Sequence, residues 1–288
     1  MGIIFALLAA LSQSILWIAL KKSYESVAPS IAFFFDMILG LLIWIPFSLI
    51  IGVDFTHMGE ILFYAVISGI LSEAFVFYVF SKGEVSYTST IFSTYPLFTI
   101  LFSVLINRES LLPIQWGLVA VIVIGTLIVS FPERINKTEW SKKSFLIWPL
   151  LGALAVGLSD TLSKGIIDRT SAESFLFGLA FAQIPVALGY LRYENQVIPK
   201  IKSIRNNWNT YKYAALGSVM NVLTVLFLWL AFARSPASIA SPITASYPGF
   251  VILLAIVFLK EKVAKKDFLG FVMIILSVMG ISYLSPGI

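Results

Sequence analysis

The feature that most constrains this chain is a succession of long apolar runs, each bounded by charged residues, glycine or proline. An α-helix needs about 20 mainly apolar residues to cross the roughly 30 Å hydrocarbon core of a bilayer. Runs near that length lie at 2–20, 30–52, 60–81, 85–106, 112–131, 145–166, 174–191, 212–232, 237–259 and 268–285. The sequence therefore predicts an all-α polytopic membrane protein with ten transmembrane helices.

Composition supports this interpretation and excludes several functional classes. Of the 288 residues, 59% are hydrophobic and only 12% charged, about half the charged fraction of a soluble protein. The chain has no cysteine and one histidine, His57, so disulfides, thiol chemistry and histidine-built metal sites are not expected. Nucleotide-binding and zincin motifs are absent from the sequence. We therefore expect no metal, no cofactor and no enzymatic activity.

Loop charges predict the topology. With ten crossings, both termini lie on the same side of the membrane. Sixteen of the 20 Lys and Arg residues fall in loops on the other side, which the positive-inside rule assigns to the cytoplasm. This count places both termini outside. The net charge of +5 is then a consequence of topology, and no nucleic-acid partner is expected.

An internal repeat divides the chain into two halves. A shift of 152 residues aligns 82–109 with 234–261 without a gap. The matched pairs include Ser86 and Ser238, Tyr95 and Tyr247, Pro96 and Pro248, and Glu109 and Glu261. Each half holds five expected crossings, an odd number, so the second half must enter the membrane upside down. We expect two inverted five-helix domains, 1–137 and 138–288, with a substrate site between them near mid-membrane.

Three features together carry a family resemblance. They are the two five-helix units, the Tyr-Pro pair in the fourth helix of each unit, and the basic-Glu pair where that helix ends (Arg108-Glu109 and Lys260-Glu261). In these features the whole chain resembles the EamA family of the drug/metabolite transporter superfamily. The resemblance implies a 5+5 inverted bundle around a cavity lined mainly by helices 1, 3, 4, 6, 8 and 9. It also implies export or exchange of small metabolites.

The chain departs from the family pattern in two respects. Family members usually carry an arginine early in the second helix, where this chain has Asp36. Asp36 is expected near a helix end, in contact with headgroups or a partner arginine. Well-known members also keep both termini in the cytoplasm, opposite to the side that the loop charges indicate.

Polar residues inside the expected crossings are the candidate substrate-binding residues, because burying them in lipid is costly. Glu73 lies just past the centre of the third crossing, and Asp160 lies four residues before Lys164 in the sixth. Either carboxyl is a candidate for proton coupling. The alternatives are a glutamate that only joins helices and an Asp160–Lys164 ion pair. The other cavity candidates are Gln13, Trp17, Thr94, Tyr95, Asn221, Trp229 and Tyr247.

Pro96 and Pro248 are expected to kink the fourth and ninth crossings. Proline lacks a backbone N–H and clashes with the carbonyl four residues earlier, so the carbonyls of Phe92 and Thr244 should lose their helical partners. Inside a membrane these carbonyls need another partner, such as a neighbouring helix, water or a ligand. The serines and threonines near these prolines fit two interpretations equally well: they line the cavity, or they are small residues that allow close helix packing.

Together these observations predict a secondary transporter, an exporter or exchanger of small organic metabolites such as amino acids or amphiphilic compounds, that works by alternating access. Its expected partners are the substrate and the lipid bilayer of a prokaryotic cell membrane. No protein partner is evident, and the protein is expected to be a monomer or homodimer. Within transport, the alternative is an organic-phosphate or nucleotide-sugar antiporter, which would need basic residues inside the cavity. From a different class, the alternative is an integral-membrane lipid-modifying enzyme.

Overall fold

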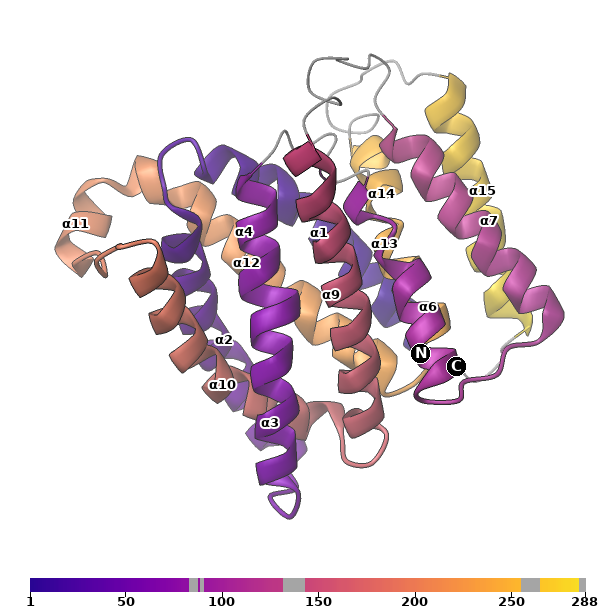
Figure 1. The fold of residues 1–288 in the computed structure, drawn as a ribbon, viewed down its shortest axis with the longest axis horizontal. Coiled ribbons are helices and arrows are strands. Elements are labelled where there is room, and N and C mark those ends of the chain that lie inside the picture. The colour runs from indigo at the N-terminus through magenta and orange to yellow at the C-terminus, as the bar shows by residue number, and fades with distance from the viewer. Residues whose placement is uncertain (83–87, 89–90, 132–142, 255–264, 285–288) are drawn as a thin grey trace.

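The computed structural model describes residues 1–82, 88, 91–131, 143–254 and 265–284. Every regular element in these residues is helical, and the helices pack into one bundle (Figure 1). In chain order they are α1 (Gly2–Ser23), α2 (Pro29–Ile51), α3 (Met58–Ser68), η1 (Gly69–Ala74), α4 (Phe75–Ser81), α6 (Tyr95–Leu105), α7 (Pro113–Ser130), α9 (Lys143–Ile167), α10 (Ala172–Tyr193), α11 (Ile201–Asn206), α12 (Trp208–Phe232), α13 (Ala237–Ala245), α14 (Tyr247–Leu254) and α15 (Lys265–Leu284).

Seven helical segments of the described chain are long and apolar enough to cross a membrane. They are α1, α2, the continuous α3–η1–α4 segment, α7, α9, α10 and α12. The expected crossings at 85–106, 237–259 and 268–285 extend beyond the described residues. The all-helical membrane class is therefore confirmed, whereas the count of ten crossings and the boundary at 137/138, outside the described residues, stay predictions.

The helix contacts recur in pairs across the two halves of the chain. α1 packs antiparallel to α12, with Gly2 beside Ser235 and Leu20 beside Gly217. Their counterparts in the other half, α9 and the α3–η1–α4 segment, are also antiparallel partners. Likewise α6 runs parallel to α9, as α13 runs parallel to α1. Exchanging the two halves therefore reproduces the main contacts of the bundle.

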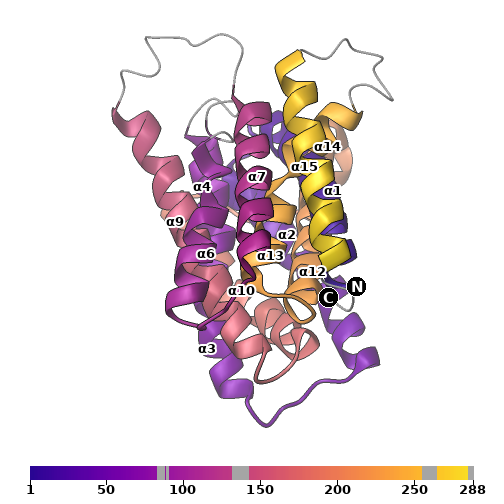
Figure 2. The ribbon, with the colours of Figure 1, turned by 90° about the vertical axis from the view of Figure 1, so that its right-hand side faces the viewer.

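Two further pairs join a helix to its own counterpart. In the antiparallel pair α2–α10, the N–H of Ser30 donates to Glu194, and the N–H of Asp54, at the other end, donates to Ser174. α7 and α15 are antiparallel as well. Figures 1 and 2 show that α1, α3 and α7 run away from the end where both chain termini lie, whereas α9, α12 and α15 run toward it. We call that end of the bundle the terminal end.

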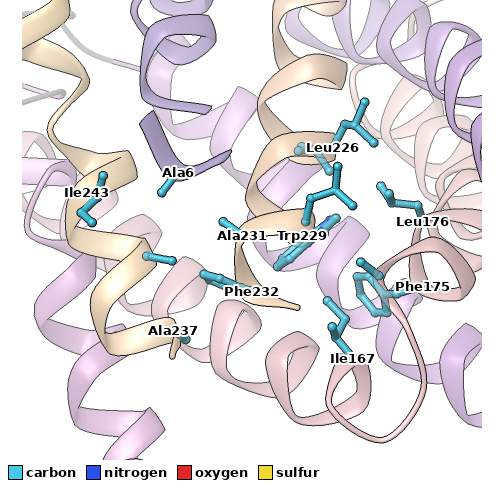
Figure 3. Packing of buried hydrophobic residues seen from close by; sticks show 14 of the residues in the cluster. Ala6, Ile167, Phe175, Leu176, Leu226, Trp229, Ala231, Phe232, Ala237 and Ile243 are labelled. Carbon is cyan, nitrogen blue, oxygen red and sulfur yellow. The ribbon is translucent and has the colours of Figure 1, made fainter. Parts of the chain in front are cut away.

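An apolar cluster joins α12 to α10 on the side of the bundle core toward the terminal end. Figure 3 shows Trp229 of α12 between Phe232 of the same helix and Phe175 of α10. The ring of Trp229 meets those of Phe175 and Phe232 edge-on, at centroid distances of 5.3 and 5.4 Å. Lipid tails are as apolar as these side chains, so the hydrophobic effect does not drive helices together inside a membrane. Close van der Waals packing of this kind holds them together instead. The cluster fixes the position of Trp229, which also lines the polar cavity described next.

Candidate substrate-binding site

Polar residues near the middle of α1, η1, α9 and α12 surround a buried cavity of about 60 Å³. Both halves of the chain contribute to it, and α6 and α13 complete its wall. The lining residues are Gln13, Trp17, Ser72, Glu73, Val76, Phe77, Phe92, Tyr95, Val156, Asp160, Asn221, Thr224, Val225, Leu228, Trp229 and Thr244. We call this space the central cavity.

Most of the predicted cavity residues lie in this lining. They are Gln13, Trp17, Glu73, Tyr95, Asp160, Asn221 and Trp229. Two others do not. Thr94 is half-buried, and its hydroxyl donates to the carbonyl of Ile91 at 2.7 Å, while Tyr247 is buried outside the lining. The structure thus brings the candidates together, and their role in binding a substrate stays a prediction.

Glu73 enters the cavity from η1, a single π-helical turn between two α-helical segments. Such turns are frequently found at functional sites, because they change the direction in which a helix presents its side chains. Asn221 Nδ2 donates to Glu73 Oε2 at 2.9 Å and to Asp36 Oδ1 at 3.1 Å. An amide nitrogen carries two hydrogens, so this one group joins both carboxyls.

Asp36 is a buried member of this cluster, and the expectation that it contacts headgroups or an arginine was wrong. Its side chain is 0% exposed, and besides Asn221 it has Gln183 Nε2 of α10 at 3.4 Å. Because α2 begins at Pro29, Asp36 lies roughly two turns inside the helix rather than at its end. Gln183, an amide in the middle of an apolar run, was the sequence signal that could have located this contact.

Asp160 of α9 is held by hydroxyl groups, so the expected ion pair with Lys164 was also wrong. Thr99 Oγ1 donates to Asp160 Oδ2 at 3.2 Å, and Ser241 Oγ lies 3.4 Å from the same oxygen. Lys164 pairs instead with Asp168, one turn further along α9. The carboxyl of Asp160 therefore joins α9 to α6 and α13. Ser241 is one of the serines before Pro248 that the sequence offered, whereas Thr99 is a site residue that the sequence did not indicate.

The helices that carry Pro96 and Pro248 are both interrupted just before the Tyr-Pro pair. In the first half, α6 begins at Tyr95 after a turn that ends at Thr94. In the second half, Ser246 separates α13 from α14. The two expected kinks thus coincide with helix breaks, which lie beside the central cavity because Tyr95 and Thr244, next to the breaks, line it.

Glu109 links the two halves at the terminal end. Its Oε1 accepts a hydrogen bond from the N–H of Ala237 at 2.8 Å, and its Oε2 accepts one from the N–H of Ser238 at 3.0 Å. The hydroxyl of Ser238 donates to the same carboxylate. The first turn of a helix has unpaired N–H groups and favours negative charge, so Glu109 caps α13 from the opposite half. The equivalent residues Glu261 and Ser86 lie outside the described residues.

Comparison with known proteins places this bundle among membrane transporters. A model of the EamA-like transporter family matches residues 1–131 and 143–283, which are the two repeats. The chain therefore belongs to the EamA-like transporter family, within the drug/metabolite transporter superfamily, and is an integral membrane protein.

Individual relatives match about half of the chain. It is 26% identical over 137 residues to an uncharacterized protein of Methanocaldococcus jannaschii, an alignment that covers 48% of this chain and 95% of that protein. It is also 26% identical over 141 residues to an uncharacterized transporter of Synechocystis, covering 47% of this chain and 43% of that protein. One solved crystal structure matches 99% of this chain and 97% of its own with a TM-score of 0.73 at 16% identity, which shows the fold alone.

Proposed function

We propose that the protein is a secondary transporter that exports or exchanges a small organic metabolite by alternating access. The observation that carries this proposal is the central cavity, where both halves of the chain surround three buried carboxyls, Asp36, Glu73 and Asp160. Ionisable groups inside a membrane are expensive and mark substrate or ion pathways. The family supplies transport as the general activity.

We further propose that ten transmembrane helices form two inverted five-helix repeats. The opposite directions of α1 and α9, of α3 and α12, and of α7 and α15 support this arrangement (Figures 1 and 2). The archaeal relative, which aligns over 95% of its own length with less than half of this chain, supports a duplication. Inverted repeats allow two nearly equivalent packings, one open to each side of the membrane.

A proton on Glu73 or Asp160, or the counter-exchange of a second solute, would couple transport to an energy source. An unpaired charge at the bilayer centre costs at least about 2.5–3.5 kcal/mol on insertion scales. Asp36 shares the Nδ2 group of Asn221 with Glu73, and Asp160 lines the same cavity, so negative charges on these carboxyls would repel one another. A carrier that releases its substrate would therefore return more readily with a proton on one of these groups.

The lining chemistry weighs against the phosphate antiporter considered as the alternative. Anionic phosphate is bound by lysine and arginine, often by two donors at once. Among the described residues, the central cavity is lined by carboxyl, amide, hydroxyl, aromatic and aliphatic groups, without a basic side chain.

Flux measurements in proteoliposomes test the proposal. With a labelled mixture of amino acids and amines, Glu73→Gln should abolish uptake driven by a pH gradient and leave solute exchange measurable, because the amide keeps the shape but cannot carry the proton. Glu25→Gln is the matched control, since Glu25 is exposed and pairs with Lys22. Unchanged gradient-driven uptake in Glu73→Gln would remove Glu73 from the mechanism.

A reporter fused to Ile288 tests the orientation in the cell membrane, where we place the protein. The charge count puts this terminus outside, and the family pattern puts it inside. In the described chain the basic residues gather at the end opposite the termini, where Lys21, Lys82 and Lys200 lie. A cytoplasmic signal would contradict the charge count and support the family pattern.

A further inference from the structure

We propose that the ligand of the central cavity is a small organic cation, a protonated amine that also carries a neutral hydrogen-bond acceptor. This inference rests on the proposed transport function and adds the substrate class to it. It follows from the charge of the cavity, from its unpaired polar atoms and from its aromatic walls.

The charge of the cavity favours a cation. The carboxyls of Glu73 and Asp160 line it, and Asp36 lies behind Asn221 in the same cluster. In the described lining no lysine, arginine or histidine balances them, and Lys164, one turn from Asp160, is paired with Asp168. A buried anion without a positive partner is unfavourable, and a bound cation would supply that partner.

Two unpaired acceptors match the N–H groups of an ammonium ion. Among the described residues, nothing within hydrogen-bond distance donates to Gln13 Oε1 or to Asp160 Oδ1. Gln13 is only 7% exposed and Asp160 only 1% exposed, so neither depends on bulk water. Buried polar atoms in native proteins normally have partners, so two orphans in one lining point to a ligand that supplies donors. An ammonium group has three N–H donors, which suffice for these atoms and for Glu73.

Two unpaired N–H donors in the same lining require a hydrogen-bond acceptor on the ligand. Trp17 Nε1 and Trp229 Nε1 are buried, and no acceptor lies within reach of them in the described part of the chain. Indole nitrogens only donate, so they need a hydroxyl or carbonyl oxygen on the ligand. A carboxylate would satisfy them but would bring a negative charge next to Glu73 and Asp160. A neutral acceptor on the ligand therefore fits better than a carboxylate.

Aromatic rings favour an organic cation over a metal ion. Trp17 stacks on Phe80 with ring centroids 3.8 Å apart, and Phe92 and Tyr95 stand beside them in the wall. Ring faces attract ammonium groups that have lost part of their hydration. The described residues contain no group of three His, Cys, Asp or Glu side chains placed to hold a metal ion. At about 60 Å³ the cavity accommodates a small headgroup, and a larger body would require it to open.

Ligands of one skeleton and different charge test this inference. One set is 3-aminopropan-1-ol, propane-1,3-diol and 3-hydroxypropanoate, and a second is 3-methoxypropan-1-amine, 3-methoxypropan-1-ol and 3-methoxypropanoate, so that both amines carry a neutral oxygen acceptor. Calorimetric titration of the purified full-length protein should show each amine binding at least tenfold more tightly than its neutral and anionic analogues. Equal or tighter binding of an alcohol or an acid, or no binding of either amine, would overturn the inference.

Two variants assign the binding to the proposed atoms. Asp160→Asn should weaken both amines at least tenfold while the protein still elutes as a single folded species, and Glu25→Gln should leave binding unchanged. Trp17→Phe keeps an aromatic ring but removes the indole N–H, so it should weaken binding of 3-aminopropan-1-ol more than binding of propylamine. Equal affinities in Asp160→Asn and the parent protein would overturn the assignment.

Flux of the same compounds separates this inference from the proposed function. Saturable flux of acids or alcohols without flux of amines would leave a transporter and overturn the cation inference. Tight amine binding without flux of any compound under a pH gradient or in exchange would uphold the cation site and contradict transport.

Discussion

Two of the cavities in the described part of the bundle lie on opposite faces of the same helical segment, and the smaller of these two is the candidate site. The central cavity is about 60 Å³ and receives Ser72, Glu73, Val76 and Phe77 from the η1–α4 face. The other face borders a groove of about 580 Å³. It is lined by Val66, Ile70, Ala74, Phe75, Tyr78, Trp148, Pro185, Val186, Gly189, Tyr190 and Tyr193. We call it the lateral groove.

The two cavities differ in chemistry as well as in volume. The lateral groove offers apolar and aromatic surface at the edge of the bundle, where Ile70 and Tyr193 are exposed. In a membrane such a surface meets acyl chains, which need no specific partner. The central cavity collects carboxyls and amides from both halves, which can stay buried only with partners. The candidate site is therefore indicated by polar groups that converge on one cavity, and not by the volume of the cavity.

Filling each cavity should separate them most strongly. Thr224→Phe places a ring in the central cavity, where Thr224 is 5% exposed, and should reduce transport at least tenfold by occupying the substrate's space. Val186→Phe adds comparable volume to the lateral groove and should change transport less than twofold. Initial rates in proteoliposomes check both. A greater loss in Val186→Phe would make the lateral groove the transport route.

Adding one methyl group beside each cavity should give the next largest difference. A Cβ at Gly157 would lie 2.5 Å from Phe98 Cβ and 2.7 Å from Thr99 N, so Gly157→Ala must push α6 away from α9. Such overpacking typically costs about 1–3 kcal/mol. A Cβ at Gly189, in the lateral groove, would meet nothing within 4 Å, so Gly189→Ala should not destabilise the protein. Unfolding in detergent measures both, and equal stabilities would contradict the tight α6–α9 contact.

Removing one phenol hydroxyl from each cavity should have the smallest effect. Tyr95→Phe deletes a long hydrogen bond, 3.5 Å to the carbonyl of Ser241, and should lower transport about two- to fivefold, since a neutral hydrogen bond contributes roughly 0.5–1.5 kcal/mol. Tyr78→Phe changes the lateral groove, where Lys82 lies over the Tyr78 ring, and should stay within twofold. Rates of uptake distinguish them. A larger loss in Tyr78→Phe would reverse the order of the two cavities.

The membrane class and many residues of the central cavity could be predicted from the sequence. Apolar runs of membrane-spanning length leave helices as the main option, because backbone groups in lipid must pair internally. Glu73 and Asn221 stood out for a related reason, since polar side chains at mid-membrane depth need partners. The need for a partner predicts that these side chains face the interior of the bundle, but it does not predict which residues they contact.

The partners could not be predicted, because they depend on how separate helices approach. Asp160 had a lysine four residues away on its own helix, yet it bonds to Thr99 from another helix. Asp36 was misplaced although the expected crossing began within one residue of α2, because its partners Gln183 and Asn221 come from other helices. The π-helical turn that presents Glu73 begins at Gly69, but one glycine inside an apolar run does not distinguish a π-helical turn from a continuous α-helix. These side-chain contacts form between helices that are distant in the sequence, so one sequence by itself carries little information about them.

The most direct test of alternating access uses one cysteine, because the natural chain contains none. Ser72→Cys places a thiol in the lining of the central cavity, and Ser203→Cys on α11 serves as a control outside it. Membrane-impermeant thiol reagents are applied to vesicles of either orientation, with and without ligand. The account predicts that Ser72→Cys is labelled from both sides in proportions that ligand or pH shifts, while Ser203→Cys is labelled from one side only. Labelling of Ser72→Cys from a single side under every condition would contradict the account.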